Sequence, residues 1–458
     1  INSMSNYSEG AQASTRLYRA VWRWHFYAGL FVVPFLLMLA LTGGYMMFYS
    51  KLSNELGWVP DVVQQEKSMP VSAQAKAALA ALPGGKLATY IAPEAANRPA
   101  FFELAKDGAY YSVAVDPYSA AVLDSHDEST TSRALAEKIH GTILLGTVGD
   151  RLIEIAASLT IIMTVTGLFL WWPRGESFVR ALIPRGGLAG RGLWRELHKT
   201  GGAWISLFLV LFILSGLAWA GIWGDSYVKP WSSFPASKWD NVPLSDVSHA
   251  SLNHDLLHEV PWTLEATPIP ASGSSAGTPA VTQPVALDSV VIWALGNGFH
   301  NQFKVAVPAD EKGVFTVSYD GRNEDSVTPS HDRYIHIDQY TGNILADVRF
   351  ADYPFVGKLM AWGIALHKGM AGWWNLAFNT VYLGLVIFAC VSGVVMWWKR
   401  RPVGQLGAPL YPRGYSVPLT VLVLGAVLSL AFPLGGLAIL AFAIVDFFLP
   451  ARLKQVGA

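Results

Sequence analysis

The chain of 458 residues is rich in apolar side chains, with 52% hydrophobic and only 14% charged residues. Because soluble domains carry about 25% charged residues, this composition indicates a membrane protein. The formal net charge is zero, so the charge total gives no reason to expect a nucleic-acid partner. The single cysteine, Cys390, excludes internal disulfides, thiolate clusters and covalent c-type haem attachment.

The first apolar stretch predicts a membrane helix from about Trp24 to Phe48, after a polar tail over residues 1–15. At about 1.5 Å per residue, such a stretch can cross a hydrocarbon core about 30 Å thick. Arginines cluster before it and Lys51 alone follows, so the positive-inside rule predicts a cytoplasmic N-terminus.

Residues 51–138 are soluble in character and, by alternation of sides, periplasmic. A helix is expected around Ser72–Leu82, and Asp116-Pro117-Tyr118 predicts a turn between two strands. The expected strands are Thr89–Ala92, Ala100–Leu104, Tyr110–Val115 and Ala121–Leu123.

A second membrane helix is expected from near Ile153 to Trp172, after the helix breakers Gly146 and Gly149. Charged residues that precede or begin it cannot lie unpaired in hydrocarbon: Asp150, Arg151 and Glu154. His140 is therefore placed on a short helical piece at the periplasmic edge. The arginine-rich loop that follows is predicted to be cytoplasmic.

The second half of the chain repeats this order. A third membrane helix is expected from about His198 to Trp223, and a fourth follows His367 and ends at Trp398. The soluble segment between them contains a Pro/Ser/Gly-rich linker, Thr267–Pro284, and a strand pair, Val314–Tyr319 and Tyr334–Ile337. A turn at Asp338–Gly342, before Ile344-Leu345, matches the turn at Asp116.

Two further apolar runs, Pro418–Phe432 and Leu437–Leu449, are near the lower length limit for a membrane span. We expect a helical hairpin, with an interfacial or re-entrant pair as the alternative.

The predicted parts are a tail (1–15), helix one (16–50), a soluble module (51–138), the His140 piece and helix two (139–173), a basic loop (174–197), helix three (198–224), a second soluble module (225–360), the His367 segment and helix four (361–401) and the hairpin (402–458).

Four histidines stand at equivalent places of the two halves. His25 and His198 open helices that leave the cytoplasm, whereas His140 and His367 precede helices that leave the periplasm. If the halves pack about a pseudo-twofold axis, each side of the membrane receives two imidazoles from opposite helices. Such a pair can clamp an iron porphyrin axially, and a b-type haem needs no cysteine. The pattern therefore predicts two b-type haems.

A single histidine at a helix mouth is more often a hydrogen-bonding residue, but four in matched positions are hard to attribute to chance. Zinc or copper would lack further ligands, since two histidines on each side come without a Cys or Asp/Glu pattern. Two other histidine groups are interpreted as a solvated surface and as an edge strand, respectively: His254 and His258 with Asp255 and Glu259, and His331, Asp332 and His336.

Several repeated motifs resemble those of the PepSY-associated transmembrane proteins, over roughly residues 16–401. They are the helix openings Trp22-Arg23-Trp24-His25 and Trp194-Arg195-Glu196-Leu197-His198, the helix middles Leu41-Thr42-Gly43 and Leu214-Ser215-Gly216, the exits Trp171-Trp172-Pro173-Arg174 and Trp397-Trp398-Lys399-Arg400, and the turns at Asp116 and Asp338. The resemblance implies an α-helical transmembrane bundle with a duplicated four-helix core and two periplasmic α+β PepSY-like modules. The C-terminal helical hairpin, expected from the apolar runs, lies outside the common pattern of the family.

Within that family the chain looks most like the inner-membrane ferric-siderophore reductases of Gram-negative bacteria, the FoxB type. The resemblance implies two b haems held by His25, His140, His198 and His367, and electrons passed outward to siderophore-bound iron in the periplasm. The fused flavodoxin-reductase domain of some relatives is missing, and no nucleotide-binding motif is found, so a quinol or a cytoplasmic reductase would be the donor.

Aromatic residues of the soluble segments could contact the chelate, although burial is the commoner role for each: Trp231, Trp239, Trp262, Trp293 and Trp373. The alternatives are a non-redox, membrane-anchored PepSY module that binds or regulates a peptidase, and a quinol-linked reductase for another periplasmic acceptor. A transporter is disfavoured, because the cores of helices two to four hold almost no ionisable residues.

Overall fold

A computed structural model describes residues 2–233, 241–253, 260–319, 328–403, 406–409 and 416–448, with side chains described from Thr15 onward except at positions 446 and 447. The chain forms two compact units. The helical unit comprises Ile1–Gly44, Lys138–Ser226 and Phe378–Ala458, and the sheet unit comprises Tyr45–Glu137 and Tyr227–Ala377.

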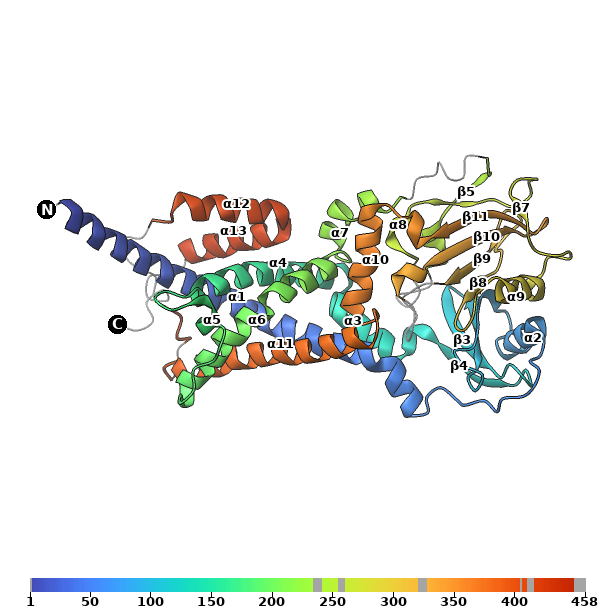
Figure 1. The fold of residues 1–458 in the computed structure, drawn as a ribbon, viewed down its shortest axis with the longest axis horizontal. Coiled ribbons are helices and arrows are strands. Elements are labelled where there is room, and N and C mark those ends of the chain that lie inside the picture. Colours follow the sequence, from blue (N-terminus) through green and yellow to red (C-terminus); the bar gives the residue numbers. More distant parts are fainter. Residues whose placement is uncertain are drawn as a thin grey trace. The chain divides into compact units, whose positions relative to one another are not determined.

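Among the residues that the structure describes, four helices are long and apolar enough to cross a membrane, so the chain is a membrane protein. They are α1 (Asn2–Glu55), α4 (Gly146–Trp171), α6 (Gly190–Leu217) and α11 (Trp373–Arg400) (Figure 1). Their ends differ from the predicted ones: α1 is already helical in the stretch expected to be a tail, and α6 begins and ends several residues early, before the short α7 (Gly221–Tyr227).

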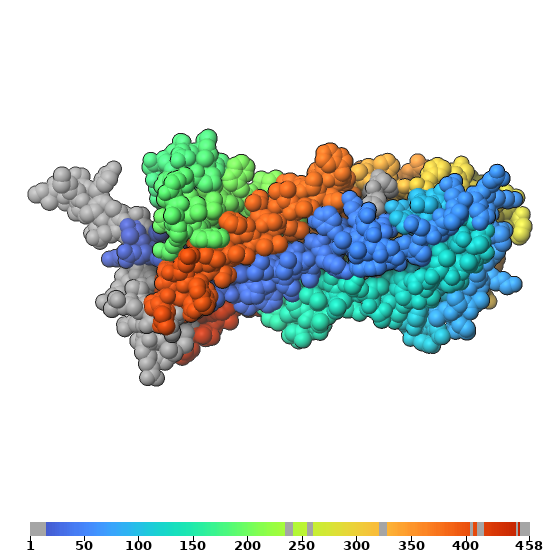
Figure 2. All heavy atoms as spheres, turned by 90° about the horizontal axis from the view of Figure 1, so that it is seen from below, coloured from blue at the N-terminus to red at the C-terminus, as the bar shows by residue number. Residues whose placement is uncertain are grey.

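The four helices bury small and branched side chains against one another, among them Val32, Ala157, Leu209 and Val386. Figure 2 shows α1 and α11 side by side, and a Cβ added at Gly44 would lie 3.6 Å from Leu383 Cδ1. Other apolar side chains face outward, such as Leu41, Leu207 and Val381, which are 61%, 67% and 66% exposed. Apolar groups on this outer surface are suited to contact with lipid tails.

The charges at the start of α4 are paired, as expected. Arg151 bonds to Asp150 and lies 3.6 Å from Glu154 Oε2. The same Glu154 oxygen accepts a hydrogen bond of 3.1 Å from the amide of Ile222, and Asp150 accepts one from Gly221. Because α7 supplies these amides, α4 can begin at Gly146, before the predicted start near Ile153.

The C-terminal apolar runs form a hairpin of α12 (Leu419–Ala431) and α13 (Pro433–Phe448), with α13 packed on α4. Helices α13 and α4 are close at Gly435, where an added Cβ would lie 2.7 Å from Ser158 Cβ. With 13 and 16 residues, both helices are shorter than the roughly 20 residues that a full membrane span requires.

The sheet unit is built on one nine-stranded sheet, in the order β4-β3-β2-β1-β8-β9-β10-β11-β7. The first soluble segment supplies β1 (Lys86–Ile91), β2 (Ala100–Lys106), β3 (Ala109–Val115) and β4 (Val122–Asp127), and the second supplies β7 (Thr278–Pro279), β8 (Lys304–Ala306), β9 (Val314–Tyr319), β10 (Arg333–Asp338) and β11 (Asn343–Arg349). β1 pairs antiparallel with β8 through Tyr90 and Val305. The two soluble segments therefore contribute their strands to one continuous sheet.

The elements on either side of this junction follow the same order. A helix precedes each set of four strands, and a 3₁₀ turn and a histidine-bearing helix follow it. In the first half these are α2 (Val71–Ala81), η1 (Glu128–Thr130) and α3 (Ser132–Thr142); in the second they are α9 (Leu287–Gly296), η7 (Phe350–Asp352) and α10 (Phe355–Lys368). The matched turns are built alike, since Asp116 Oδ1 and Asp338 Oδ1 each accept a 2.8 Å bond from the amide two residues on.

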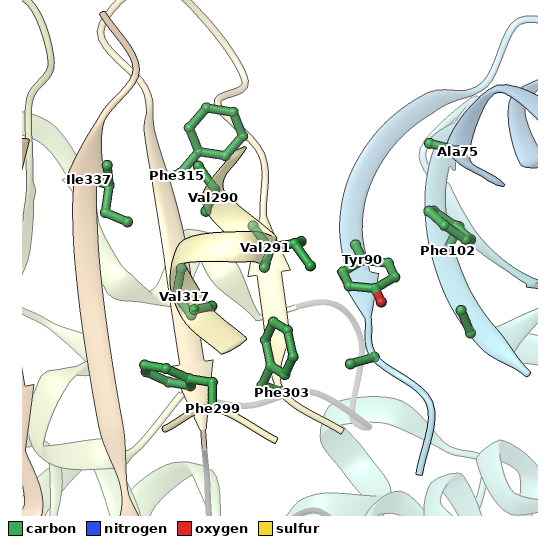
Figure 3. Close-up of a cluster of buried hydrophobic side chains, with 14 of the residues drawn as sticks. Ala75, Tyr90, Phe102, Val290, Val291, Phe299, Phe303, Phe315, Val317 and Ile337 are labelled. Atoms are coloured by element: carbon green, nitrogen blue, oxygen red, sulfur yellow. The ribbon is translucent and has the colours of Figure 1, made fainter. Parts of the chain in front are cut away.

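One hydrophobic core runs under the junction of the two halves. Tyr90 lies between Phe102 of its own half and Phe303 of the other, with ring centroids 5.3 and 6.2 Å away. Figure 3 shows Val290 and Val291 of α9 beside the strands of the second half. The predicted linker Thr267–Pro284 is also packed, because it contains β6 (Pro268–Pro270), paired with β5 (Leu244–Ser248), and β7.

Phe102 is fully buried in this core, so its truncation should destabilise the sheet unit. We expect Phe102→Ala to lower the free energy of unfolding by about 3–5 kcal/mol, because the large side chain leaves a cavity. Phe355→Ala is the control, since Phe355 is 76% exposed. Thermal unfolding in detergent, followed by tryptophan fluorescence, compares the two variants. Equal midpoints would contradict the assigned core.

Candidate functional site

His25 on α1 is held by the backbone and a hydroxyl of α4. Its Nδ1 lies 3.0 Å from the carbonyl oxygen of Met163 and 3.1 Å from Thr166 Oγ1. A carbonyl oxygen can only accept a hydrogen bond, so the ring proton is assigned to Nδ1. The other ring nitrogen, Nε2, then carries a free lone pair.

His198 on α6 repeats this arrangement against α11. Its Nδ1 lies 3.0 Å from the carbonyl oxygen of Ala389 and 2.9 Å from Ser392 Oγ. The carbonyl and the hydroxyl again come from residues three apart on one helix. His25 and His198 also lie near enough to interact electrostatically. The structure thus brings together the pair that the repeat predicts.

His140, on α3, faces α1 in the same manner. Its Nδ1 lies 2.9 Å from Thr42 Oγ1, and the backbone of Leu39 lies beside the ring. Burial lowers the pKa of His140 to about 4, and the Leu39 backbone opposes that shift only in part. The imidazole is therefore neutral at pH 7, the form that ligates metals.

The three hydroxyl groups act as acceptors toward the rings, because each donates its proton to its own helix. Thr166 Oγ1 and Ser392 Oγ bond at 2.9 Å to the carbonyls of Met163 and Ala389. Thr42 Oγ1 bonds at 2.7 Å to the carbonyl of Met38. In the described part of the chain nothing bonds to Nε2 of His25, His140 or His198. A histidine whose Nδ1–H is held and whose Nε2 is open is arranged as a metal ligand.

A glycine follows each of these hydroxyl residues and makes room for the ring. A Cβ would lie 3.0 Å from His25 Cε1 at Gly167, 3.3 Å from His140 Cε1 at Gly43 and 3.5 Å from His198 Cε1 at Gly393. We name the combination of carbonyl, hydroxyl and glycine a histidine seat: Met163/Thr166/Gly167 for His25, Ala389/Ser392/Gly393 for His198 and Leu39/Thr42/Gly43 for His140.

Gly43 and Gly216 belong to the helix-middle motifs of the sequence, but the bonds between the hydroxyls and the histidines were missed. Their signal is a Thr-Gly or Ser-Gly pair in each membrane helix. The fourth pair, Ser215-Gly216 on α6, has the same local bonds, since Ser215 Oγ donates to the carbonyls of Leu211 and Phe212, both at 2.9 Å.

His367 belongs to the sheet unit, at the last turn of α10. Asn375 fixes the end of that helix: its Nδ2 donates to the Leu366 carbonyl at 3.2 Å, and its Oδ1 accepts from the Ala371 amide at 3.1 Å. Asn375 is 2% exposed, so this bridge between α10 and α11 is buried. It determines where the backbone beside His367 lies.

A second histidine pair lies inside the sheet unit. His249 Nδ1 donates to the carbonyl of Thr267 at 2.7 Å, so its Nε2 must accept from His336 Nε2, 2.9 Å away. His336 Nδ1 in turn accepts from Thr316 Oγ1 at 3.0 Å. Both rings are fully buried. β10, which carries His336, lies between β9 and β11, so its interpretation as an edge strand is wrong.

The remaining candidate residues are scattered. His331 is exposed, and Asp332 is buried. Trp231 and Trp373 are 53% and 82% exposed, whereas Trp262 is buried and Trp293 packs against the sheet core. His254, Asp255, His258, Glu259 and Trp239 lie outside the described residues. Over the described ranges, no three His, Cys, Asp or Glu side chains gather as a metal site.

Comparison with known protein families gives a match that covers most of the chain. Residues 22–400 match the family described as the PepSY-associated TM region. The chain belongs to this family. The match includes all three histidine seats and both soluble segments. No curated protein matches the sequence. The PepSY-associated chain is a membrane protein, in agreement with its long apolar helices.

The glycines of the seats predict a graded response to an added methyl group. Gly167→Ala should displace His25, because a 3.0 Å contact is too close, whereas Gly393→Ala should be tolerated, because 3.5 Å is an ordinary contact. We expect Gly167→Ala to lose thermal stability and Gly393→Ala to keep it. Melting curves of the purified variants measure this. A reversed order would refute the seat geometry.

The buried histidine pair predicts acid lability. Burial lowers the pKa of His249 to about 4 and holds that of His336 well below its usual value. Between about pH 6.5 and pH 4 the unfolded chain binds protons that the folded chain does not. The free energy of unfolding should fall as the pH is lowered, by up to about 1.4 kcal/mol per pH unit and histidine. The double variant His249→Gln/His336→Gln should show a shallower slope; an unchanged slope would exclude the pair as its source.

Proposed function

We propose that the protein is an inner-membrane di-haem b reductase that passes electrons outward to Fe(III) held by a siderophore in the periplasm. His25 and His198 would hold the haem nearer the cytoplasm, and His140 and His367 the haem nearer the periplasm. The observation that carries the proposal is the histidine seat, repeated for three of these four residues. It keeps the proton on Nδ1 and leaves Nε2 as a ligand.

The residues present fit an iron porphyrin better than they fit a bare metal ion. Bis-imidazole ligation needs two neutral rings, with Nε2 free, that approach from different helices. His25 on α1 and His198 on α6 meet these conditions, and each ring is oriented through Nδ1 by a further helix. A tetrahedral zinc or copper site would need further side-chain ligands.

When bound, each haem would supply one-electron transfer. The chain's own contribution is to select the imidazole tautomer, to orient the rings through their Nδ1 bonds and to keep them apart from bulk water. His140 stays neutral because its burial disfavours the charged form. Each ring therefore presents a lone pair without first having to lose a proton. No side chain needs to form a covalent intermediate.

The substrate follows from the chemistry of iron. Hard oxygen chelators bind Fe(III) far more tightly than Fe(II), so adding one electron weakens the complex and frees the metal. We assign chelate binding to the sheet unit. Among the aromatic candidates Trp373 and Trp231 are exposed and can contact a ligand, whereas the buried Trp262 serves packing.

The repeated order of elements supports an internal duplication of the chain. Both halves run from a long helix through a helix and four strands to a histidine-bearing helix and a second long helix. Basic residues at the ends of α4 and α11 and in the loop before α6 support a cytoplasmic placement of those ends: Arg174, Arg180, Arg185, Arg191, Lys399, Arg400 and Arg401. The sheet unit would then be periplasmic, with a quinol or a cytoplasmic reductase as electron donor.

A non-redox, membrane-anchored PepSY module is the main alternative. It accounts for the soluble sheet, but it gives no reason for three seats that present the same ring nitrogen. A reductase for a different periplasmic acceptor would use the same haems, and it differs only in what the reduced protein can reduce.

The deciding measurement is a haem count. We expect the purified protein, loaded with haem in its host, to show two b haems per chain by pyridine haemochrome, and about one in His25→Ala or His140→Ala. His126→Ala is the matched control, because His126 is partly exposed and pairs with the nearby acidic residues Asp124 and Glu128. The reduced protein should then convert a ferric trihydroxamate to Fe(II), trapped by a ferrous chelator. A folded, host-loaded protein without haem would exclude the proposal.

A further inference from the structure

We propose that the hydroxyl groups of the histidine seats, on Thr166, Ser392 and Thr42, set the reduction potential of the haem whose ligand each one holds. They are positioning residues, since they act through the imidazole and not on the iron. The inference rests on the proposed function, because it requires His25, His198 and His140 to be iron ligands.

The geometry gives the Nδ1 protons of His25 and His198 two acceptors each. For His25 the carbonyl and the hydroxyl lie 3.0 and 3.1 Å from Nδ1, and for His198 they lie 3.0 and 2.9 Å away. Neither acceptor is closer by more than a tenth of an ångström, so the proton is shared. The carbonyl alone would fix the tautomer. The hydroxyl therefore adds something other than the choice of tautomer.

The direction of the hydroxyl decides what it adds. Thr166, Ser392 and Thr42 donate their own protons to backbone carbonyls of their helices, so their oxygens present lone pairs to the rings. A second acceptor draws the Nδ1 proton further from the ring and raises the basicity of Nε2. A more basic ligand stabilises Fe(III) relative to Fe(II) and lowers the potential.

A structural role for the hydroxyls must be distinguished from this one. Ser and Thr in membrane helices commonly donate to the carbonyl four residues back. Thr164 on α4 and Ser206 on α6 do so, at 2.8 and 2.6 Å from the carbonyls of Thr160 and Gly202. In the described part of the chain, neither Thr164 nor Ser206 forms a hydrogen bond with a histidine. These two residues are matched controls on the same class of helix.

The seats also assign each hydroxyl to one haem. Thr166 and Ser392 act on the two ligands of a single iron, through His25 and His198, whereas Thr42 acts through His140 on the other. Removing either of the first two should move one redox transition and leave the other in place. Removing both should move the same transition further. Removing Thr42 should move the second transition.

The experiment is a spectroelectrochemical titration of the purified, haem-loaded protein. We expect Ser392→Ala and Thr166→Val each to raise the Fe(II)/Fe(III) ratio of one haem about three- to tenfold at fixed potential, where tenfold corresponds to about 59 mV for one electron. The double variant should show about the product of the two effects. Thr42→Val should shift the other haem, and Thr166→Ser, which keeps the hydroxyl, should restore the original potential.

The control variants distinguish a failure of this proposal from a failure of the proposed function. Thr164→Val and Ser206→Ala should leave both transitions unmoved; a shift of the same size in these controls would overturn the assignment. Two bound haems with unchanged potentials in Ser392→Ala and Thr166→Val would also overturn it, while leaving the proposed function standing. A wild-type protein without haem would instead refute the proposed function. If Thr166→Val fails to load haem, Ser392→Ala, which removes one oxygen atom only, decides the question.

Discussion

A neutral imidazole buried among helices has one proton for its two ring nitrogens. The position of that proton decides which nitrogen can bind a metal, and the packing of these helices determines the position. A backbone carbonyl cannot donate, so a carbonyl facing Nδ1 leaves Nε2 bare. His25 and His198 each meet such a carbonyl, from Met163 and Ala389, and His140 meets the Thr42 oxygen, whose own proton is donated to the Met38 carbonyl. The helices must approach closely for this contact, and the glycines at 167, 43 and 393 permit that approach.

The same constraint links helix packing to chemistry. The residues of a seat are spaced so that a carbonyl, a hydroxyl and a glycine lie on one face of one helix, three and four positions apart. A shift of either helix along its axis would bring the ring opposite a different carbonyl and remove the hydroxyl. The apolar side chains that fix the register of α1, α4, α6 and α11 therefore also fix the orientation of the imidazoles.

Sequence patterns predicted the elements better than the contacts between them. The strand Val314–Tyr319 matches β9 residue for residue, and the helix at Ser72–Leu82 is shifted by one position, because both have strong local periodicity. The three-residue β8 was missed, since a strand that short has no pattern of its own. The pairing of Tyr90 with Val305 was missed too, because local patterns do not record which distant strands meet.

The four histidines were found in the sequence because they recur at equivalent places, whereas the hydroxyls that hold them were not. A serine or threonine in a membrane helix has a default partner in its own backbone, so it gives no sign of a second one. Only the recurrence of Thr166, Ser392 and Thr42 beside a glycine distinguishes them from Thr164 or Ser206. The buried pair of His249 and His336 had no such recurrence and became visible only in the folded sheet.

The short ladder between β1 and β8 has a consequence for any shorter form of this chain. A protein that ended after α4 would fold four strands and leave the free edge of β1, at Thr89–Ile91, open to solvent. An open edge of this kind recruits another strand. In the full chain this edge pairs with β8, which is the first strand of the second half, as β1 is of the first. A half-length relative would therefore be expected to pair its β1 with the β1 of a second copy and to form a symmetric dimer. In such an assembly the histidine seats that one polypeptide forms here would be divided between two identical subunits.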